Sequence, residues 1–398
     1  MTCKVLHNYA YNKVLWRYAM VKTRLTNKLE CFDETYRSYE KRGIRKLFFK
    51  VTDYKILSRH LNLIQSKMAK IEMLWEESEN AYVPRGIISL KGLMFENLQT
   101  LKLLVVEHNF LKLLCDTAPS ISYLNFSGSR FDDDCAEAIL NFKNLKALTI
   151  AKTCLSDKGI ATISGYVKNI RHYDRDSSAP FLATIEILDI SENRWVTGES
   201  WQLLKNLTKL KVLVTDDKLV NGSHYSQLKE VTSLRCIAIE KSIWPEKILI
   251  SYSKQESCLL SSICFSNSDM SDEGLQHLKK GFKNVKFLKV SQSCMTDRGI
   301  EFICRFLPDL IILDVQGNPN ITDKALQIIS DKLMSLKLLS IKDCHNITEE
   351  QVSVMPKDLN VIRNADYGLK QLEIISRKHK QYSDLWVHYV FINYRLIL

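Results

Sequence analysis

Cysteine, histidine and aspartate are the residues of this chain that could do chemistry, but they lack the spacing of a catalytic or metal-binding motif. The 398 residues contain 11 cysteines and 9 histidines, with no Cys-x-x-Cys, His-Glu-x-x-His or Gly-x-Ser-x-Gly sequence and no glycine-rich phosphate loop. Histidines such as His108, His172, His277 and His345 stand singly, which favours hydrogen-bonded or solvated side chains over metal ligands. We therefore expect a protein that is not an enzyme and that holds no metal and no cofactor.

One acidic cluster, Asp132-Asp133-Asp134 beside Cys135, has the ligand types of a metal site. A comparable place 24 residues later holds Ser156 and Asp157, just before a helical pattern. A Ser, Thr or Asp in that place caps a helix, because its side-chain oxygen accepts a hydrogen bond from a free backbone N–H. Helix capping is therefore favoured over metal binding.

The elements that must position these residues come from a unit of about 25 residues that recurs from Ile121 to Leu359. Its clearest copies, residues 285–309 and 310–335, open with apolar-x-x-apolar-x-apolar and become helical after Thr-Asp. A unit of this length cannot bury its own apolar face, so successive copies must stack. The steps between copies are 24 to 26 residues, except for one of 40. The second apolar position is held by Leu124, Leu148, Leu188, Leu213, Ile237, Ile263, Leu288, Leu313 and Leu339.

Two short signals follow the strand pattern. Ser or Thr with an acidic residue after it begins the helical stretch in five copies, at positions 156, 271, 296, 322 and 348. The hydroxyl caps the helix and the acid complements its dipole. Before that turn comes a small or hydrogen-bonding side chain, which can satisfy backbone groups that the short strand leaves unpaired. These residues are Cys154, Cys294 and Cys344, or Asn193, Asn267 and Asn318.

This pattern resembles the leucine-rich repeat, in its cysteine-containing subtype, over at least residues 121–359. The resemblance implies an α/β solenoid with a curved parallel sheet inside and helices outside, preceded by a helical N-terminal segment. We expect repeats at 121–362 and degenerate leading repeats at 46–120. The copies centred on Leu213 and Ile237 lack the Thr-Asp start, so we expect their helices to be shorter or irregular.

Residues 363–398 are expected to form a C-terminal cap. The run LWVHYVFINYRLIL at 385–398 is too apolar to stay solvated and too short to span a bilayer. It would cover the open end of the last repeat, and the alternative is packing on the concave face. The one longer step contains the polar residues 166–180, which predict a surface loop, with a recognition element as the other interpretation.

Bulk composition bounds the class of protein. With 45% hydrophobic residues the chain is not largely disordered. The odd cysteine count and the lack of a secretory signal favour mostly buried, reduced thiols in the cytoplasm or nucleus. No apolar run reaches the roughly 18 residues of a membrane span. The net charge of +11 belongs to residues 1–70, and a solvated helical face or an acidic partner is favoured there over nucleic acid or anionic lipid.

Residues 3–17, CKVLHNYAYNKVLWR, resemble the second half of an F-box, which opens with Cys-Lys or Cys-Arg and ends in Leu-Trp-Arg. The first half, with its Leu-Pro pair, does not occur at the start of this sequence, so either it lies upstream or the chain cannot fully hold a Skp-type adaptor. The resemblance assigns Leu6, Leu15 and Trp16 to helices that face the adaptor or pack on the linker, within a segment at 1–45. The alternative is an amphipathic helix that caps the solenoid, with Trp16 as a buried anchor.

Strand residues on either side of the core leucines point to the concave face of such a solenoid. One column there is largely apolar and the outer one is polar, which is typical of a protein-binding surface, although neighbouring side chains or the C-terminal tail could cover it. We expect the centre of this surface at Phe287, Ile312 and Leu338, with Lys289 and Asp314 beside them. The same columns contain Tyr123, Ile187 and Asp189.

The leading hypothesis for function is a substrate-recognition subunit of a Skp–cullin–F-box ubiquitin ligase, as the resemblance implies. The F-box would hold the Skp-type adaptor and cullin, and the concave face would present a captured protein. The alternative is a leucine-rich-repeat scaffold in an assembly with no ligase. An inhibitor of the ribonuclease-inhibitor kind would need a strongly acidic concave face, which the balanced charge of residues 71–398 does not supply. No nucleic-acid or membrane partner is expected.

Overall fold

The computed structural model describes residues 20–25, 29–50, 54–76, 90, 92–104, 106–165, 182, 184–216, 224–253, 259–278 and 280–363. The contacts divide the chain into two compact units. Unit 1 comprises residues 1–185 and 193–195, and unit 2 comprises residues 186–192 and 196–398.

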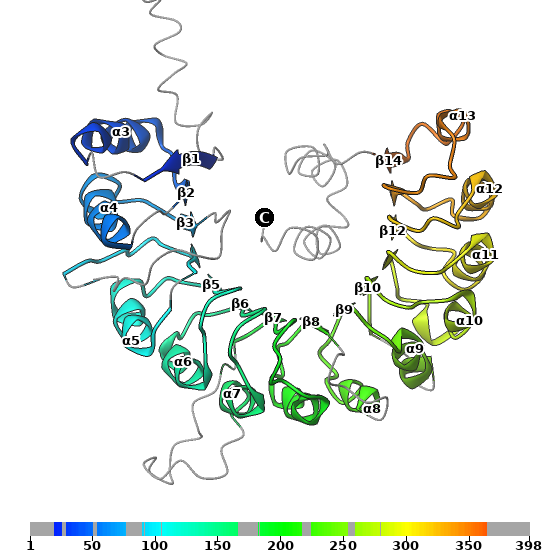
Figure 1. Cartoon of the computed structure of the whole chain (residues 1–398), viewed down its shortest axis with the longest axis horizontal. Coiled ribbons are helices and arrows are strands. Elements are labelled where there is room, and N and C mark those ends of the chain that lie inside the picture. The colour runs from blue at the N-terminus through cyan, green and yellow to red at the C-terminus, as the bar shows by residue number, and fades with distance from the viewer. Residues whose placement is uncertain are drawn as a thin grey trace, which may run out of the picture. The chain divides into compact units, whose positions relative to one another are not determined.

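Unit 1 contains a parallel sheet in which strands that follow one another in the chain are also neighbours in the sheet (Figure 1). Its strands are β1 (Met20–Arg24), β2 (Lys46–Lys50), β3 (Met73–Glu76), β4 (Thr100–Lys102), β5 (Tyr123–Asn125) and β6 (Ala147–Thr149). The helices between them lie on one side of this sheet. They are α3 (Leu29–Arg42), α4 (Tyr54–Lys67), α5 (His108–Thr117), α6 (Asp133–Ala138) with the 3-10 turn η1 (Ile139–Asn141), and α7 (Asp157–Ile163).

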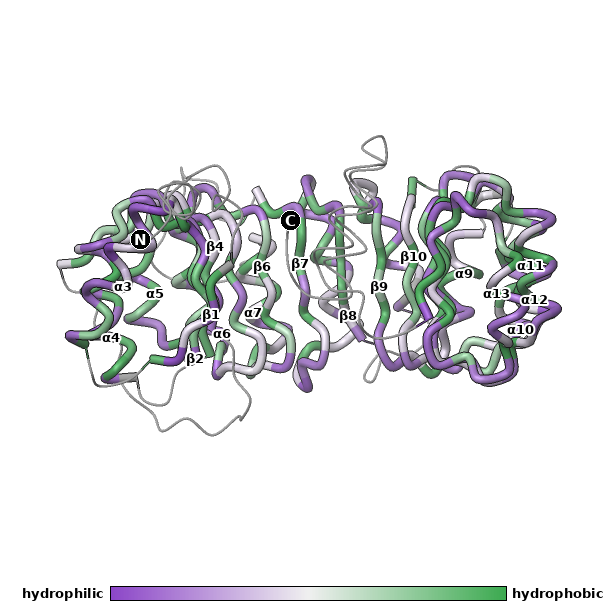
Figure 2. The backbone as a smooth tube through the Cα atoms, turned by 90° about the horizontal axis from the view of Figure 1, so that it is seen from above, coloured by the Kyte–Doolittle hydropathy of each residue, from purple (hydrophilic) through white to green (hydrophobic). Residues whose placement is uncertain are grey.

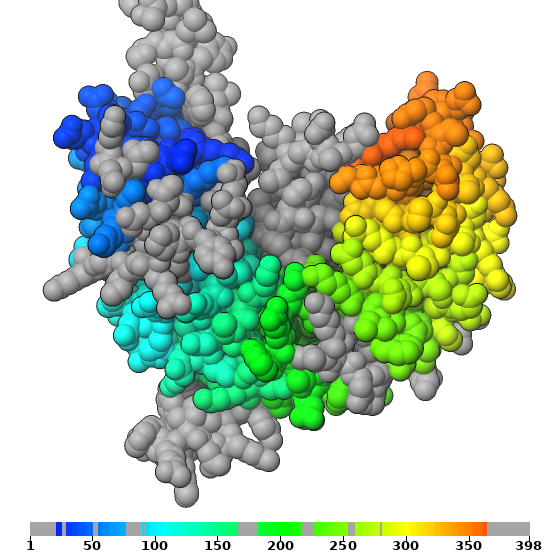
Figure 3. Space-filling view, viewed as in Figure 1, coloured from blue at the N-terminus to red at the C-terminus, as the bar shows by residue number. Residues whose placement is uncertain are grey.

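Unit 2 repeats the same plan, and its repeats pack against one another in chain order (Figure 3). Its strands are β7 (Ile187–Asp189), β8 (Val212–Asp216), β9 (Cys236–Glu240), β10 (Ser262–Ser266), β11 (Phe287–Ser291), β12 (Ile312–Asp314), β13 (Leu338–Ser340) and β14 (Asn360–Ile362). Its helices again lie on one side of the sheet. They are η2 (Gly198–Asn206), α8 (Tyr225–Leu228), α9 (Pro245–Ser253), α10 (Asp272–Leu275), η3 (Lys280–Phe282), α11 (Asp297–Phe306), α12 (Asp323–Lys332) and α13 (Glu349–Ser353).

The strand register matches the predicted alignment of the repeats. Leu288 pairs with Leu313 and Leu313 with Leu339, while Leu124 pairs with Leu148 in unit 1. All five leucines are fully buried, so the core of each unit lies between sheet and helices. Hydrophobic strands alternate with more hydrophilic connections along the backbone (Figure 2). The predicted α/β leucine-rich-repeat solenoid is confirmed.

Two parts of the alignment need correction. Strand β1 lies before the range 46–120 expected for the degenerate leading repeats, whereas β2, β3 and β4 lie within that range, where no strand was aligned. The copy centred on Leu213 is followed by the four-residue helix α8, as expected for an irregular copy. The copy centred on Ile237 is followed by the nine-residue helix α9, so the expectation of a short helix was wrong there. Pro245 stands at its first position, where a fixed φ favours a helix start without a Thr-Asp pair.

The residue after the strand satisfies backbone groups, as predicted. Asn318 Nδ2 donates to the carbonyls of Val290 and Val315 at 2.7 and 2.8 Å, and its Oδ1 accepts from the Ser293 N–H at 3.1 Å. In the following repeat the Cys344 thiol takes the same place and donates to the Val315 carbonyl at 3.2 Å. In these two repeats a buried side chain thus links the strand end to the preceding repeat.

In three copies this position was predicted one residue away from its true place, too late at Cys154 and Cys294 and too early at Asn267. Cys154 and Cys294 are exposed, and Asn267 has a left-handed backbone with a φ of 51°. The correct place is three residues after the last core apolar side chain, because the chain needs that length to turn back under the strand. It is occupied there by Thr153, Ser293 and Ser268.

The predicted helix caps are present. The hydroxyls of Thr296 and Thr322 accept from backbone N–H groups of their helices at 3.2 and 3.3 Å. Asp132 Oδ1 accepts from the N–H of Cys135 at 3.0 Å, so the acidic cluster caps α6 as expected.

Candidate functional site

The inner face of unit 2 is the side of its sheet opposite the helices, formed by the strand residues that alternate with the core apolar positions. Strand pairing aligns these residues in two columns, and each column runs across the sheet from β7 to β13. The first column consists of Ile187, Val212, Cys236, Ser262, Phe287, Ile312 and Leu338. The second consists of Asp189, Val214, Ala238, Cys264, Lys289, Asp314 and Ser340.

The structure brings the predicted centre of the binding surface together. Phe287 pairs with Ile312 and Ile312 with Leu338, and Lys289 pairs with Asp314 in the second column. The three apolar side chains are fully buried, and Lys289 is 5% exposed. The pattern predicted an exposed apolar strip, but in the structure water has almost no access to it.

Lys289 and Asp314 form a buried ion pair. Lys289 Nζ lies 3.8 Å from Asp314 Oδ2, and their side chains are 6% and 1% exposed. Asp314 Oδ1 accepts from the N–H of Gln316 at 3.2 Å, whereas Oδ2 has no hydrogen-bond partner. Burial raises the pKa of the Asp314 carboxyl, against the opposing effect of the Lys289 charge and the Gln316 N–H. A charged pair in such an apolar place costs desolvation free energy that a distance of 3.8 Å recovers only in part.

The acidic and amide residues of the second column also serve the fold. Asp189 Oδ1 accepts from the N–H of Ser191 at 3.1 Å and from its hydroxyl at 2.7 Å. In unit 1, Asn125 Oδ1 accepts from the N–H of Ser127 at 3.1 Å in the same way. These local turns are typical of Asp and Asn, so Asp189 has a structural role whether or not it also contacts a partner.

The sheet of unit 1 carries an aromatic row that the sequence analysis missed. Phe48 and Trp75 lie with ring centroids 6.1 Å apart, and Trp75 and Tyr123 are also 6.1 Å apart. Lys102 Nζ lies 5.0 Å from the Trp75 ring centroid, and the Tyr123 hydroxyl lies 3.2 Å from that of Thr149. Of these residues only Tyr123 was predicted at the face. The strand pattern KLFFK at Lys46–Lys50 held the signal, but the leading repeats were not aligned.

Three predicted elements lie outside the described residues. These are the F-box-like stretch with Leu6, Leu15 and Trp16, the loop at 166–180, and the C-terminal segment at 364–398.

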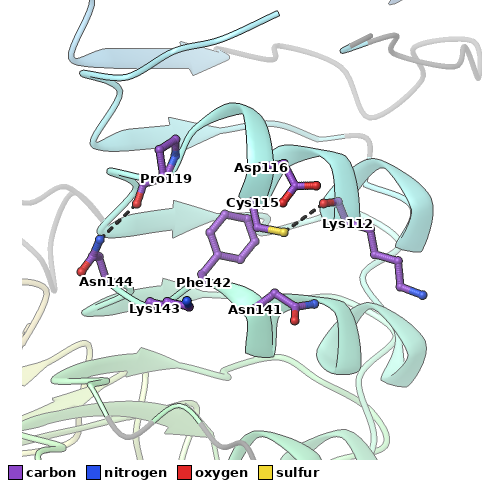
Figure 4. Close-up of a pocket in the computed structure, with 8 residues that line it drawn as sticks. All are labelled: Lys112, Cys115, Asp116, Pro119, Asn141, Phe142, Lys143 and Asn144. Carbon is purple, nitrogen blue, oxygen red and sulfur yellow. Dashed lines mark hydrogen bonds between the residues drawn. The ribbon is translucent and has the colours of Figure 1, made fainter. Parts of the chain in front are cut away.

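A surface pocket of about 650 Å³ lies in unit 1 beside the C-terminal end of α5 (Figure 4). The Asn144 amide donates to the Pro119 carbonyl at 3.1 Å, and the Cys115 thiol donates to the Lys112 carbonyl at 2.9 Å. Burial raises the pKa of the Cys115 thiol, so it is not an activated nucleophile. The lining is Lys112, Cys115, Asp116, Pro119, Asn141, Phe142, Lys143 and Asn144.

Within the described parts of the chain, no three His, Cys, Asp or Glu side chains are grouped so that they could hold a metal ion. None of the described helices has the length and apolar character that a membrane span requires.

No model of a known protein family matches the chain, and no curated protein matches it. Among solved structures, a complex of Rad7 and Elc1 in yeast is similar at 13% identity, over 91% of this chain and 94% of that chain, with a TM-score of 0.41. An internalin (InlF) from Listeria monocytogenes is similar at 14% identity, over 76% and 83%, with a TM-score of 0.37. TLR13 in a complex with ssRNA13 is similar at 14% identity, over 84% and 52%, with a TM-score of 0.46. Similarities this distant carry no functional argument.

Proposed function

We propose that this chain is a protein-interaction scaffold that binds its partner on the inner face of unit 2, centred on Phe287, Ile312 and Leu338. The ion pair of Lys289 and Asp314 is the observation that carries the proposal. The same column holds Val214 and Ala238 in other repeats, so the fold does not require charge there. A buried pair that is dispensable for folding and leaves a carboxylate oxygen without a hydrogen bond is suited to a partner that supplies a donor.

Partner binding tests this proposal. Once a partner is identified, the triple variant Phe287→Ala, Lys289→Glu, Asp314→Lys should lose its binding, measured by calorimetry with purified proteins. The matched control reverses an exposed pair on the helices, Lys324→Glu with Glu301→Lys, whose atoms lie 3.2 Å apart in the native protein. The control should bind normally. Equal affinity of the triple variant and the native chain would overturn the inner face as the site.

The more specific proposal is a substrate-recognition subunit of a Skp–cullin–F-box ubiquitin ligase, acting in the cytoplasm or nucleus. It is supported by the likeness of residues 3–17 to the second half of an F-box, placed ahead of leucine-rich repeats. Such a subunit holds a substrate near the ligase and performs no chemical step itself, which agrees with a site built from apolar side chains and one ion pair. A scaffold with no ligase remains the second candidate, and it needs only the inner face.

Affinity purification separates these two candidates. A Skp-type adaptor and a cullin should co-purify with the native chain, and Leu15→Asp with Trp16→Ala should lose both while keeping the inner-face partner. If neither protein co-purifies with a chain extended by any upstream coding sequence, the ligase role is excluded and the scaffold stands.

A further inference from the structure

Two thiols meet on the inner face of unit 2. Cys236 of β9 pairs with Ser262 of β10. Cys264 lies two residues further along β10, where it pairs with Ala238. The two cysteines are therefore diagonal neighbours on one face of the sheet, both are fully buried, and one thiol donates a hydrogen bond to the other. They belong to successive repeats, so a search for sequence motifs does not reveal the pair.

The strand register keeps these two thiols from forming a disulfide unless the backbone moves. A strand spacing of about 4.8 Å and a rise of about 3.3 Å per residue place the two Cα atoms roughly 8 Å apart. A disulfide needs Cα atoms about 4.4–6.8 Å apart, and both cysteines are free in the structure. A metal ion between two sulfurs spans a longer distance than an S–S bond, because two metal–sulfur bonds replace one bond. The pair thus has the spacing of a metal bridge.

The set of ligands restricts which ion could bind. Among the residues that the structure describes, no three His, Cys, Asp or Glu side chains are grouped for a metal, so this place supplies two ligands. Structural zinc takes about four ligands, and calcium takes about six to eight oxygens. Cu(I) is a soft cation that prefers thiolates and accepts two of them in a line. We propose that Cys236 and Cys264 hold one Cu(I) ion between their sulfurs, a role beyond partner binding.

Lys289 supplies the charge that such an ion needs. Two thiolates around one monovalent cation leave a single negative charge, which is costly in a buried place without a counter-charge. Lys289 of β11 pairs directly with Cys264, and its side chain is as buried as its ion pair with Asp314 requires. Burial, with smaller effects of Cys236 and Asp314, keeps the pKa of the Cys264 thiol well above its usual value, and the Lys289 charge acts in the opposite direction. The ammonium group thus stabilises a thiolate once a metal ion displaces the proton.

The neighbours of the two thiols favour a low coordination number. Ser262 and Ala238 occupy the other diagonal of the same group of four, and both have small side chains. Both are also buried, so water has almost no access as an additional ligand. The shell around a metal site controls the access of solvent, and a dry shell protects thiolate-bound Cu(I) from oxidation.

Competition with a coloured Cu(I) chelator tests the site. The reduced full chain is titrated with Cu(I) in the presence of bathocuproine disulfonate, without oxygen. Cys236→Ser and Cys264→Ala should each weaken the tightest Cu(I) binding by about 100-fold or more, since loss of even an outer-shell partner costs about 10- to 100-fold. The matched control is Cys304→Ala, which removes a buried thiol of helix α11 and should keep the native affinity. Equal affinity in the native chain and in both variants would overturn the proposal.

X-ray absorption at the copper edge gives a second readout that needs no variant. The native chain, loaded with half an equivalent of Cu(I) so that only its tightest site fills, should show two sulfur neighbours and no nitrogen or oxygen. Three sulfurs, a nitrogen ligand, or no copper retained against the chelator would refute the proposal. If circular dichroism shows that a variant has unfolded, this spectrum of the native chain decides. Neither measurement involves a protein partner, so a failure here is distinct from a failure of the proposed function.

Discussion

At the scale of single residues, each regular repeat bends its backbone at one left-handed position. In the repeat of β11 this is Gln292, with a φ of 52°, whose N–H donates to the Gln316 carbonyl of the next repeat at 2.9 Å. Two of these residues are glycine, which adopts this conformation readily. At the other positions the repeat imposes a backbone conformation that the residue disfavours, at a cost in folding free energy of about 1 kcal/mol per residue. The positions are Gly128, Lys152, Glu192, Lys241, Asn267, Gln292, Gly317 and Asp343.

Gly317 is the position where this constraint is sharpest. Its φ is 69°, and an added Cβ would lie 2.7 Å from Cγ of Gln292. Gly317→Ala should lower the free energy of unfolding by about 1–2 kcal/mol in urea denaturation. Gln292→Ala is the matched control and should be nearly neutral alone. The double variant should recover the part of the loss that comes from the clash, and a Gly317→Ala chain as stable as the native one would contradict this account.

The ion pair of Lys289 and Asp314 makes a second prediction at this scale. Asp314→Asn keeps an acceptor for the Gln316 N–H but removes the negative charge beside the buried Lys289, so it should cost about 3–5 kcal/mol. Adding Lys289→Met should restore stability to near the native value, as Val214 and Ala238 indicate. Urea denaturation of both variants measures this. A double variant as unstable as the single one would show that the fold needs the pair, and would weaken the functional proposal.

The pH dependence of the pair has a definite sign. Because burial raises the folded-state pKa of Asp314 above its unfolded value of about 3.9, the folded protein binds this proton more tightly. The contribution of this carboxyl to the free energy of unfolding therefore falls as pH rises from the unfolded to the folded pKa. The double variant should lack that slope.

At the scale of the elements, carboxylates at the helix starts join successive repeats. Asp297, in the first turn of α11, accepts from the Thr322 N–H at 2.8 Å and from the Thr322 hydroxyl at 2.6 Å, and Thr322 caps α12. Asp272 holds Thr296, and Asp323 holds Thr348, in the same way. Each cap is thus held by the repeat before it, and the caps form a continuous ladder over α10 to α13.

Removing one of these carboxylates should destabilise the repeat that follows it. Asp297→Ala leaves the Thr322 N–H and hydroxyl without their acceptor, so we expect a loss of about 1–3 kcal/mol in the free energy of unfolding. Asp331→Ala, an exposed carboxylate on α12, is the matched control and should change stability by less than about 0.5 kcal/mol. Combining Asp297→Ala with Thr322→Ala should cost less than the sum of the single losses. Simple additivity would show that the two side chains act independently.

The ladder also shows how far the sequence could be interpreted. The period, the core leucines and the Thr caps were predictable, because each is a local pattern repeated many times. The hydrogen bonds from Thr322 to Asp297 were not predictable. In the sequence, Asp297 was already explained as an acidic residue that complements the dipole of its own helix. The burial of Phe287 and Lys289 was not predictable either, because the strand pattern alone does not determine how far water reaches the inner face.

At the scale of the whole molecule, stacked repeats make stability a local quantity. Each repeat contacts only its neighbours, so damage is expected to spread a few repeats and then fade. The contacts divide the chain near residues 186–196, and the following helical elements are the 3-10 helix η2 and the short helix α8. We therefore expect the two units to open separately.

Hydrogen exchange followed by mass spectrometry can test this separation. Asp297→Ala should speed the exchange of amides in α11 to α13 by about tenfold or more, and leave amides of α6 and α7 in unit 1 unchanged. The converse variant is Asp133→Ala, since Asp133 holds Ser156 in unit 1 at 2.9 and 2.6 Å. It should speed exchange in α6 and α7 and spare α11 to α13. If either variant raises exchange equally in both units, the chain unfolds as one cooperative body and the division into two units has no energetic meaning.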